Sequence, residues 1–332
     1  MRAEKDLSQS IRLVLMTLGR KALPDLLKRI FARGQESSAS VPTDDDSPPT
    51  ALLSAAEGQD VQLAVDDILG KGGRPLIWVN GIAQRSGTVY MGELIRQHPD
   101  VCAYPGEIWE YPLGGLCPVL ADVERTFHQL YPQNRDTIGA GVLPAVMLAG
   151  AMRYVLNKVP AGRRLLLKNP RATGVSTLAR LFSKDIFIVM IRDGRDVVAS
   201  TICTWPDVDF DEACSMWRVG ADCVLGLRDL IESGTVNNAL LVRYEDLLAD
   251  MPSSMRDVLA HARLDGRLYP FEEARELPVR GSSVLNRSKV DWEPRRKPQG
   301  FQPVGRWQDW DEAKRRRFHA LCGRQMEALG YL

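Results

Sequence analysis

The stretch GIAQRSGTVYMGELIRQHPDV, residues 81–101, decides the fold. It follows a short apolar run, Leu76 to Val79, which predicts a buried strand. From residue 88 to residue 97 its apolar residues recur at helical spacing and share one face. A strand that passes through a glycine-containing turn into a helix directs backbone N–H groups at one point, and that point suits an anion.

The turn itself adds polar groups to this predicted anion site. Arg85 supplies a fixed positive charge, and Ser86 and Thr88 supply hydroxyl donors. A Walker A loop, G-x-x-x-x-G-K-[ST], does not fit, because five residues separate Gly81 from Gly87 and no lysine precedes Thr88. A capped helix start with an incidental arginine is the alternative interpretation.

The rest of the chain repeats the alternation of strand and helix. Apolar runs predict strands at residues 164–168, 186–191 and 240–242, and helical spacing predicts helices from Gly194 and over residues 211–233 and 311–329. This alternation predicts an α/β fold with three layers and a central parallel sheet. Ligands of such folds bind beyond the carboxyl ends of the strands.

A second candidate site lies at such a strand end. Arg192 follows the apolar run at 186–191, and Ser200 stands eight residues later on the next predicted helix. Asp193 can cap that helix, so its charge does not argue against a nearby anion. The alternative is an ordinary surface network of arginine and aspartate.

Together these segments resemble the PAPS-dependent sulfotransferase family. The resemblance rests on five segments: residues 81–101 resemble the 5′-phosphosulfate loop, DIFIVMIRDGRDVVAS (185–200) the 3′-phosphate motif, and LLVRYEDLLADMP (240–252) the Tyr-Glu-Asp-Leu segment, with GRW at 305–307 and LGY at 329–331 also in family style. The chain lacks a histidine between residues 99 and 127 and the longer glycine-rich C-terminal loop of the cytosolic small-molecule enzymes. It is therefore more similar to the bacterial, carbohydrate and tyrosyl-protein branch.

The resemblance implies a role for each matching position. Arg85, Ser86, Gly87 and Thr88 would hold the 5′-phosphosulfate of PAPS, Arg192 and Ser200 its 3′-phosphate, and Tyr244 would lie near the adenine, with Arg306 in the C-terminal donor-binding loop and Ser282 or Ser283 joining it. Val89 stands where many relatives carry a second threonine, so one hydroxyl donor is absent.

The resemblance also implies the catalytic groups. Lys168 and Arg85 would stabilise charge on the leaving phosphate oxygen, and Glu107 would be the general base. Glu110 is a second candidate base and His98 a weaker one. Lys168 could instead be an exposed strand-end lysine, and Glu107 an ordinary loop carboxylate. The reaction requires no metal, and the sequence shows no carboxylate cluster for one.

The first 60 residues of the sequence predict a different organisation. Residues 1–34 read as a basic amphipathic helical arm, residues 35–60 as a disordered Ser/Asp/Pro linker, and residues 61–332 as the catalytic domain. The arm either packs on its own domain or docks on a membrane surface or a protein. No apolar run is long enough to span a membrane, and no secretory signal is visible. We therefore expect a cytoplasmic protein, with membrane association through the arm as an alternative.

Composition and charge bound the function. The net charge of +1 over 332 residues gives no global field for nucleic acid. The predicted partner is a hydroxyl-bearing acceptor, which can be a carbohydrate, lipid, phenol or tyrosine, bound by segments within residues 108–160 and 203–222. Two other functions stay open: a P-loop phosphotransferase that uses ATP, and a non-catalytic nucleotide-binding protein that acts through the basic arm.

A basic stretch runs from Arg280 to Lys297, just before the GRW segment. It is either a lid over an anionic ligand or a solvated loop.

Overall fold

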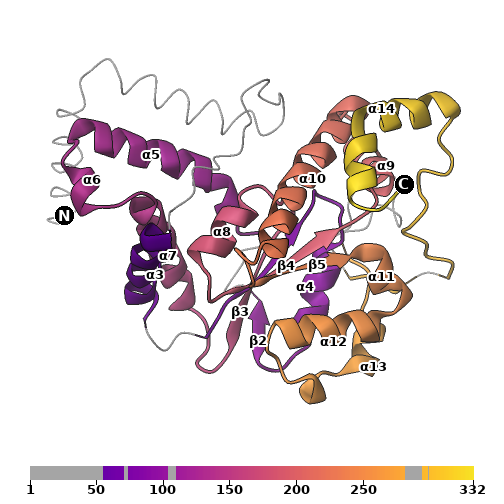
Figure 1. Ribbon diagram of the computed structural model, residues 1–332. Helices are drawn as coiled ribbons and strands as arrows, with labels where there is room; N and C mark the ends of the chain where they lie inside the picture. Colours follow the sequence, from indigo (N-terminus) through magenta and orange to yellow (C-terminus); the bar gives the residue numbers. More distant parts are fainter. Residues whose placement is uncertain (1–54, 71–73, 104–109, 281–293, 298) are drawn as a thin grey trace, which may run out of the picture. The chain divides into compact units, whose positions relative to one another are not determined.

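The computed structural model describes residues 55–70, 74–103, 110–280, 294–297 and 299–332. The predicted arm and most of the predicted linker lie outside these residues. Helix α3 spans Ala55–Leu69 (Figure 1). It begins six residues before the predicted domain start at 61, so residues 55–60, which we expected to belong to the linker, are helical.

The described residues form a five-stranded parallel sheet in the order β2-β3-β1-β4-β5. The strands are β1 (Ile77–Gly81), β2 (Val101–Ala103), β3 (Arg164–Asn169), β4 (Ile186–Ile191) and β5 (Ala239–Arg243). Every residue of β1, β3 and β4 is buried, as expected for central strands covered on both faces. The predicted α/β class with a central parallel sheet is confirmed.

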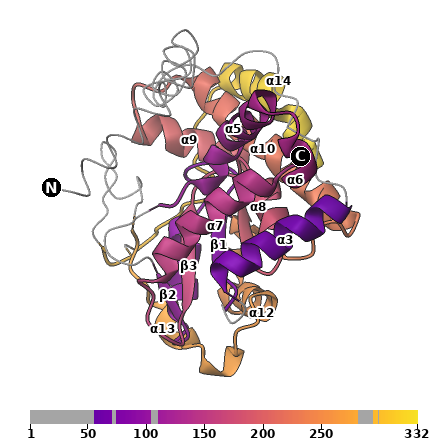
Figure 2. The same ribbon diagram turned by 90° about the vertical axis from the view of Figure 1, so that its left-hand side faces the viewer.

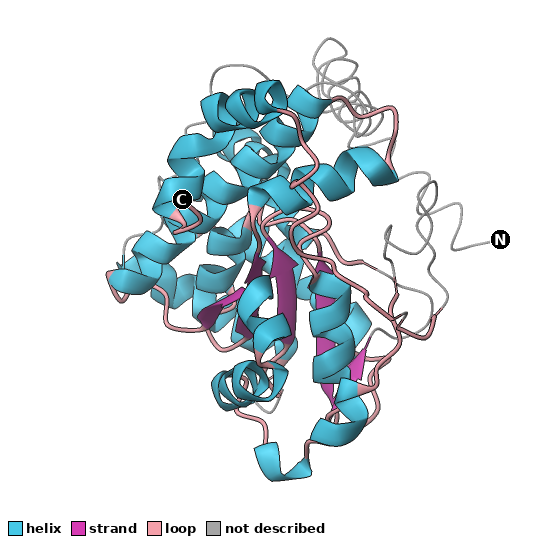
Figure 3. Ribbon diagram, turned by 90° about the vertical axis from the view of Figure 1, so that its right-hand side faces the viewer, coloured by secondary structure: helices cyan, strands magenta, loops and turns pink. Residues whose placement is uncertain are grey.

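Helices cover both faces of the sheet (Figure 3). One face carries α4 (Thr88–Arg96), α11 (Tyr244–Ala249), α12 (Met251–His261) and α13 (Phe271–Arg275). The other face carries α3, α7 (Val142–Leu156), α8 (Val175–Leu181), α9 (Gly194–Thr204), α10 (Phe210–Glu232) and α14 (Glu312–Ala328). Helix α3 lies along α7 (Figure 2), and α5 (Cys117–Leu130) also packs on α7 and is followed by the short α6 (Asn134–Thr137). None of the described helices combines the length and the apolar character needed to cross a bilayer.

A buried carboxylate joins the strands at the amino edge of the sheet. Asp185 accepts hydrogen bonds from Leu76 N at 2.9 Å and from Trp78 Nε1 at 3.0 Å. The Trp78 ring stacks on Phe187 at 5.5 Å between centroids. These contacts hold β1 in register with β4 at the amino edge of the sheet, which is opposite the predicted site.

The strand order decides where the site forms. Strand β1 lies between β3 and β4, and the chain visits one side of the sheet through α4 and β2 before it crosses to β4 and β5. A crevice opens at such a point beyond the carboxyl ends of the strands. At this edge the predicted site residue Arg85 follows β1, Lys168 lies near the end of β3, Arg192 follows β4, and Tyr244 follows β5.

Candidate active site

Residues 82–87 link β1 to α4 in a tight loop. A Cβ atom on Gly81 would lie 2.3 Å from Ser86 Oγ and 2.9 Å from the Pro170 carbonyl oxygen, so only glycine fits there. The Ser86 hydroxyl donates to the Ala83 carbonyl oxygen, and this bond holds the loop closed. The φ angle of Arg85 is +71°, a left-handed conformation that is uncommon for a residue with a side chain. The loop is thus shaped by internal contacts.

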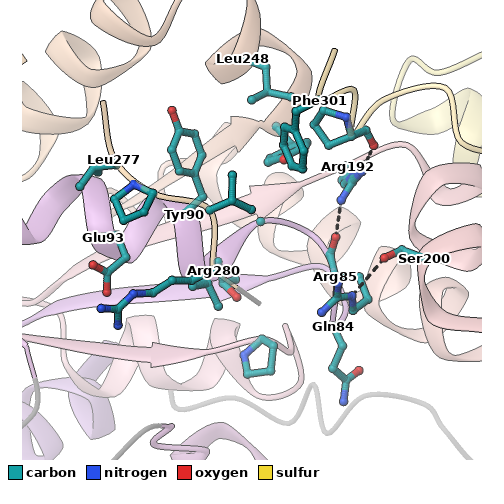
Figure 4. A pocket seen from close by; sticks show the side chains of 18 of the residues that line it. Gln84, Arg85, Tyr90, Glu93, Arg192, Ser200, Leu248, Leu277, Arg280 and Phe301 are labelled. Carbon is teal, nitrogen blue, oxygen red and sulfur yellow. Dashed lines mark hydrogen bonds between the residues drawn. The ribbon is translucent and has the colours of Figure 1, made fainter. Parts of the chain in front are cut away.

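The two predicted phosphate segments meet at this loop. Arg85 Nε donates to Ser200 Oγ at 3.0 Å, and Arg192 Nη1 donates to the Arg85 carbonyl oxygen at 2.6 Å (Figure 4). Arg192 follows β4, and Ser200 lies on α9. Residues more than 100 positions apart in the sequence therefore form one hydrogen-bonded unit.

Three arginines give this unit its charge. Burial, and next the charges of Arg192 and Arg306, lower the pKa of Arg85 to about 10, so Arg85 stays protonated at neutral pH. Burial also lowers the pKa of Arg306. The Arg192 Nε atom is buried and makes no hydrogen bond within the described residues. Like charges gathered in a partly buried site favour the binding of an anion, and a phosphate or sulfate group fits this arrangement.

Tyr244 closes one side of the unit. It begins α11 directly after β5, is buried, and lies under the Arg192 guanidinium at 4.4 Å from the ring centroid. The φ angle of Gly87 is +94°, and a Cβ atom there would lie 2.4 Å from Tyr244 Cδ2. The loop and the aromatic ring thus pack directly against each other.

The C-terminal segment that carries Arg306 is tied to the same strand end. Arg192 Nη2 donates to the Pro303 carbonyl oxygen, and the Arg195 guanidinium lies 4.1 Å from the centroid of the Trp307 ring. Asp196 accepts hydrogen bonds from the backbone of this segment. Asp196 was absent from our predicted site, although the sequence Arg-Asp-Gly-Arg-Asp places it on the first turn of α9.

Lys168 lies near the end of β3, and its side chain is buried. Its Nζ atom is 2.8 Å from Glu110 Oε1, and the exposed fractions of the two side chains are 5% and 37%. Lys168 is therefore not an exposed strand-end lysine.

Of the candidate bases, Glu107 lies outside the described residues. His98 is buried, and both of its ring nitrogens lie within hydrogen-bond distance of backbone groups, Asp100 N and the Asp265 carbonyl oxygen, each at 3.1 Å. The His98 ring is used by the fold, which argues against a role as base.

One cavity of about 400 Å³ collects most of these side chains. The predicted site residues that line it are Arg85, Gly87, Thr88, Lys168, Arg192, Ser200, Tyr244 and Arg306. Ser86 lies inside the loop instead. Sequence reasoning missed the apolar wall, which includes Tyr90, Leu248, Leu277 and Phe301 (Figure 4). From the basic stretch, Arg280 and Lys297 line the cavity, whereas Arg287 and Lys289 lie outside the described residues.

The fold and the cavity define an α/β protein with a cluster of arginines beside a cavity at a topological switch point. Comparison with known sequences sharpens this class. A profile of the Sulfotransferase family matches residues 75–267, more than half of the chain. The chain therefore belongs to the sulfotransferase family, and its chemistry is sulfuryl transfer.

Individual relatives are distant. Protein-tyrosine sulfotransferase 1 of Danio rerio is 23% identical over 266 residues, which cover 77% of this chain and 72% of the relative. Protein-tyrosine sulfotransferase 2 of Gallus gallus is 27% identical over 198 residues, which cover 56% of this chain and half of the relative. Among solved structures, a mouse sulfotransferase complexed with PAP aligns with a TM-score of 0.44 and 14% identity, over 81% of this chain and 88% of the mouse chain.

Proposed function

We propose that this sulfotransferase takes its sulfuryl group from PAPS and transfers it to a hydroxyl group of a carbohydrate, lipid, phenol or tyrosine acceptor. The observation that carries the proposal is the hydrogen-bonded unit of Arg85, Ser200 and Arg192 on one cavity. PAPS carries anionic groups at both its 5′ and its 3′ position. A loop site and a strand-end site side by side suit a ligand with two such groups.

Each predicted residue has a place in this proposal. The loop residues Arg85, Ser86, Gly87 and Thr88 would bind the 5′-phosphosulfate, and Arg192 and Ser200 the 3′-phosphate. Tyr244 would lie near the adenine, and Arg306 would add a third positive charge. Besides burial, the charges of Arg192 and Arg306 lower the pKa of Arg85, and the charge of Arg192 lowers that of Arg306, so the three guanidinium groups lie close together, which supports a ligand with several negative charges.

The chemistry needs a cation and a base at defined points. When bound, the donor supplies a sulfuryl group whose bond to a phosphate oxygen breaks as its bond to the acceptor oxygen forms. Lys168 and Arg85 would stabilise the negative charge on the leaving oxygen. Glu107 would accept the proton of the acceptor hydroxyl. Glu110 is the alternative base, and its contact with Lys168 places a carboxylate beside the proposed cation.

A nucleotide-binding experiment tests the donor. The full chain is melted with 3′,5′-adenosine bisphosphate, AMP, ADP and ATP, each with magnesium and with EDTA. A ligand at 100 times its Kd stabilises a fold by about 2.7 kcal/mol, which raises the melting temperature measurably. We expect the largest shift with the bisphosphate, unchanged by EDTA and lost in Arg192→Ala. Arg267→Ala is the matched control, since that side chain is 89% exposed and lies on a different segment.

The other outcomes contradict the proposal in distinct ways. A shift with ATP and magnesium alone would support phosphoryl transfer. Binding of the bisphosphate, with a turnover that neither Lys168→Ala nor Glu107→Ala changes, would support a non-catalytic binding protein.

A cytoplasmic location, with docking of residues 1–34 on a membrane surface or a protein, also belongs to this proposal. Sedimentation of the chain with anionic vesicles tests the membrane part.

A further inference from the structure

We propose that Asp196 is a positioning residue that sets the selectivity for a 3′-phosphorylated nucleotide by fixing the backbone from which Arg306 extends. This inference rests on the proposed function, because it assigns Arg306 to the nucleotide site. It concerns a carboxylate that would not touch the nucleotide itself.

The contacts of Asp196 are made with backbone groups far away in the sequence. Its side chain is fully buried on the first turn of α9. Its Oδ2 atom accepts from Gly305 N at 2.9 Å, and its Oδ1 atom accepts from Arg306 N at 2.7 Å. Both carboxylate oxygens are therefore engaged by two consecutive N–H groups of one segment.

The conformation of Gly305 explains this convergence. Its φ angle is +81°, in the left-handed region that glycine adopts without strain. Successive N–H groups around a left-handed residue form a concave nest that binds anions. In this protein the anion in the nest is the carboxylate of Asp196. A side chain of the chain itself thus holds the segment in place.

The side chain of Arg306 faces the nucleotide cavity from this fixed backbone. Arg306 lines the cavity, and after burial and the charge of Arg192 its own charge lowers the pKa of Arg85. Its guanidinium lies near Cys203, which follows Ser200 by three residues on α9. Arg306 therefore lies on the side of the cavity where Ser200 and Arg192 would hold the 3′-phosphate. A shift of its backbone would move a charge at that point.

A carboxylate suits this role better than an amide. Asparagine at position 196 offers a single acceptor oxygen, so one of the two N–H groups would lose its partner. The amide NH2 would also face an N–H group. The flanks of the segment have separate attachments, because Arg192 bonds the Pro303 carbonyl oxygen and Arg195 packs on Trp307. An Asp196 variant should therefore keep the segment close to α9, but the backbone at Gly305 and Arg306 should no longer be held in one position.

The test compares two affinities on the full chain. Calorimetry gives the Kd of 3′,5′-adenosine bisphosphate and of AMP, and the ratio of the two is the selectivity. In Asp196→Asn we expect the Kd of the bisphosphate to rise about tenfold or more, which corresponds to about 1.4 kcal/mol, and the Kd of AMP to change little. Asp196→Glu keeps two acceptor oxygens and should recover part of the ratio.

Asp185→Asn is the matched control. Asp185 is also a buried carboxylate that accepts two N–H groups, but it lies at the opposite edge of the sheet. Its replacement should lower the melting temperature and leave the selectivity unchanged. A merely structural role of Asp196 would give the same pattern, with a lower melting temperature and the wild-type ratio, and would overturn the proposal.

Arg306→Ala keeps the proposal falsifiable if Asp196→Asn does not fold. This variant leaves Asp196 and both backbone bonds in place and should lose the same selectivity. An unchanged ratio in Arg306→Ala overturns the inference. A wild-type chain that binds the bisphosphate no better than AMP would instead contradict the proposed donor, so the two failures are distinguishable.

Discussion

Replacement of Gly87 by alanine should damage both the stability of the fold and nucleotide binding. Gly87 precedes α4 in the loop that carries Arg85, and its φ angle is +94°. The added Cβ atom would lie 2.4 Å from Cδ2 and 2.6 Å from Cε2 of Tyr244. Tyr244 cannot move away easily, because it is buried and packed beneath Arg192.

The magnitude follows from two separate costs. A left-handed conformation costs a residue with a Cβ atom roughly 1–2 kcal/mol. Insertion of a methyl group into a packed interior costs typically about 1–3 kcal/mol. We therefore expect Gly87→Ala to lower the free energy of unfolding by about 2–5 kcal/mol. Because the overlap pushes the loop and Tyr244 apart, the affinity for 3′,5′-adenosine bisphosphate should fall as well.

Equilibrium denaturation in urea measures the first effect and calorimetry the second. Gly92→Ala on the following helix, α4, is the control, since its Cβ atom would meet nothing closer than 3.9 Å. Alanine in a helix interior is favoured over glycine by roughly 0.5–1 kcal/mol, so this variant should be slightly more stable than the wild type. Tyr244→Ala should relieve the overlap, so the cost of Gly87→Ala should be smaller in that background. Equal stability of the Gly87→Ala and Gly92→Ala variants would refute the reasoning.

Three further predictions concern other parts of the molecule. Lys168→Ala should lower turnover, measured as acceptor sulfation or donor hydrolysis, by about 100-fold or more while the Kd of the bisphosphate changes far less; a parallel loss of both would assign Lys168 to binding. Burial raises the pKa of Asp185 from 3.8 to about 7, so the folded chain holds an additional proton between these values and the free energy of unfolding should fall as pH rises through this window. Urea titrations across the window should show this slope in the wild type and a flatter curve in Asp185→Asn. Tyr331→Phe removes the bond from its hydroxyl to Glu245 Oε2, 2.9 Å long, and should cost about 1 kcal/mol in urea denaturation, since Glu245 keeps its bond from Asp193 N.

Much of the sheet could be predicted because its strands are uninterrupted apolar runs. The predicted strand at 186–191 has the bounds of β4, and the predicted strand at 164–168 is one residue shorter than β3. Strand β2 has only three residues, too few to show a period, and it was missed. Helix α3 begins at Ala55, inside residues 35–60, which we expected to form the Ser/Asp/Pro linker. Packing along α7 supports this helix, and local composition does not reveal that packing.

The site could be predicted to the extent that topology brings strand ends together. Arg85 and Arg192 each follow a parallel strand, and such strands end at one edge of the sheet, so their meeting was foreseeable. The role of Asp196 could not be foreseen, because its partners are the backbone N–H groups of residues 305 and 306. Every residue except proline has such a group, so the sequence does not single these two out. The pairing of Lys168 with Glu110 likewise joins strand β3 to a loop, and their approach depends on the whole fold.

The central place of β1 also has a consequence for how the chain acquires its fold. Val79 pairs with Lys168 on one side and with Ile188 on the other, so both neighbours of this strand lie about a hundred residues downstream. Contacts of such long sequence separation form slowly, since loop closure precedes any gain from pairing. During synthesis from the N-terminus, β1 and the loop after it emerge well before either neighbour. The apolar strand β1 therefore stays unpaired until its neighbours are synthesised. Chains with such an exposed, unpaired strand are prone to aggregate and to bind chaperones.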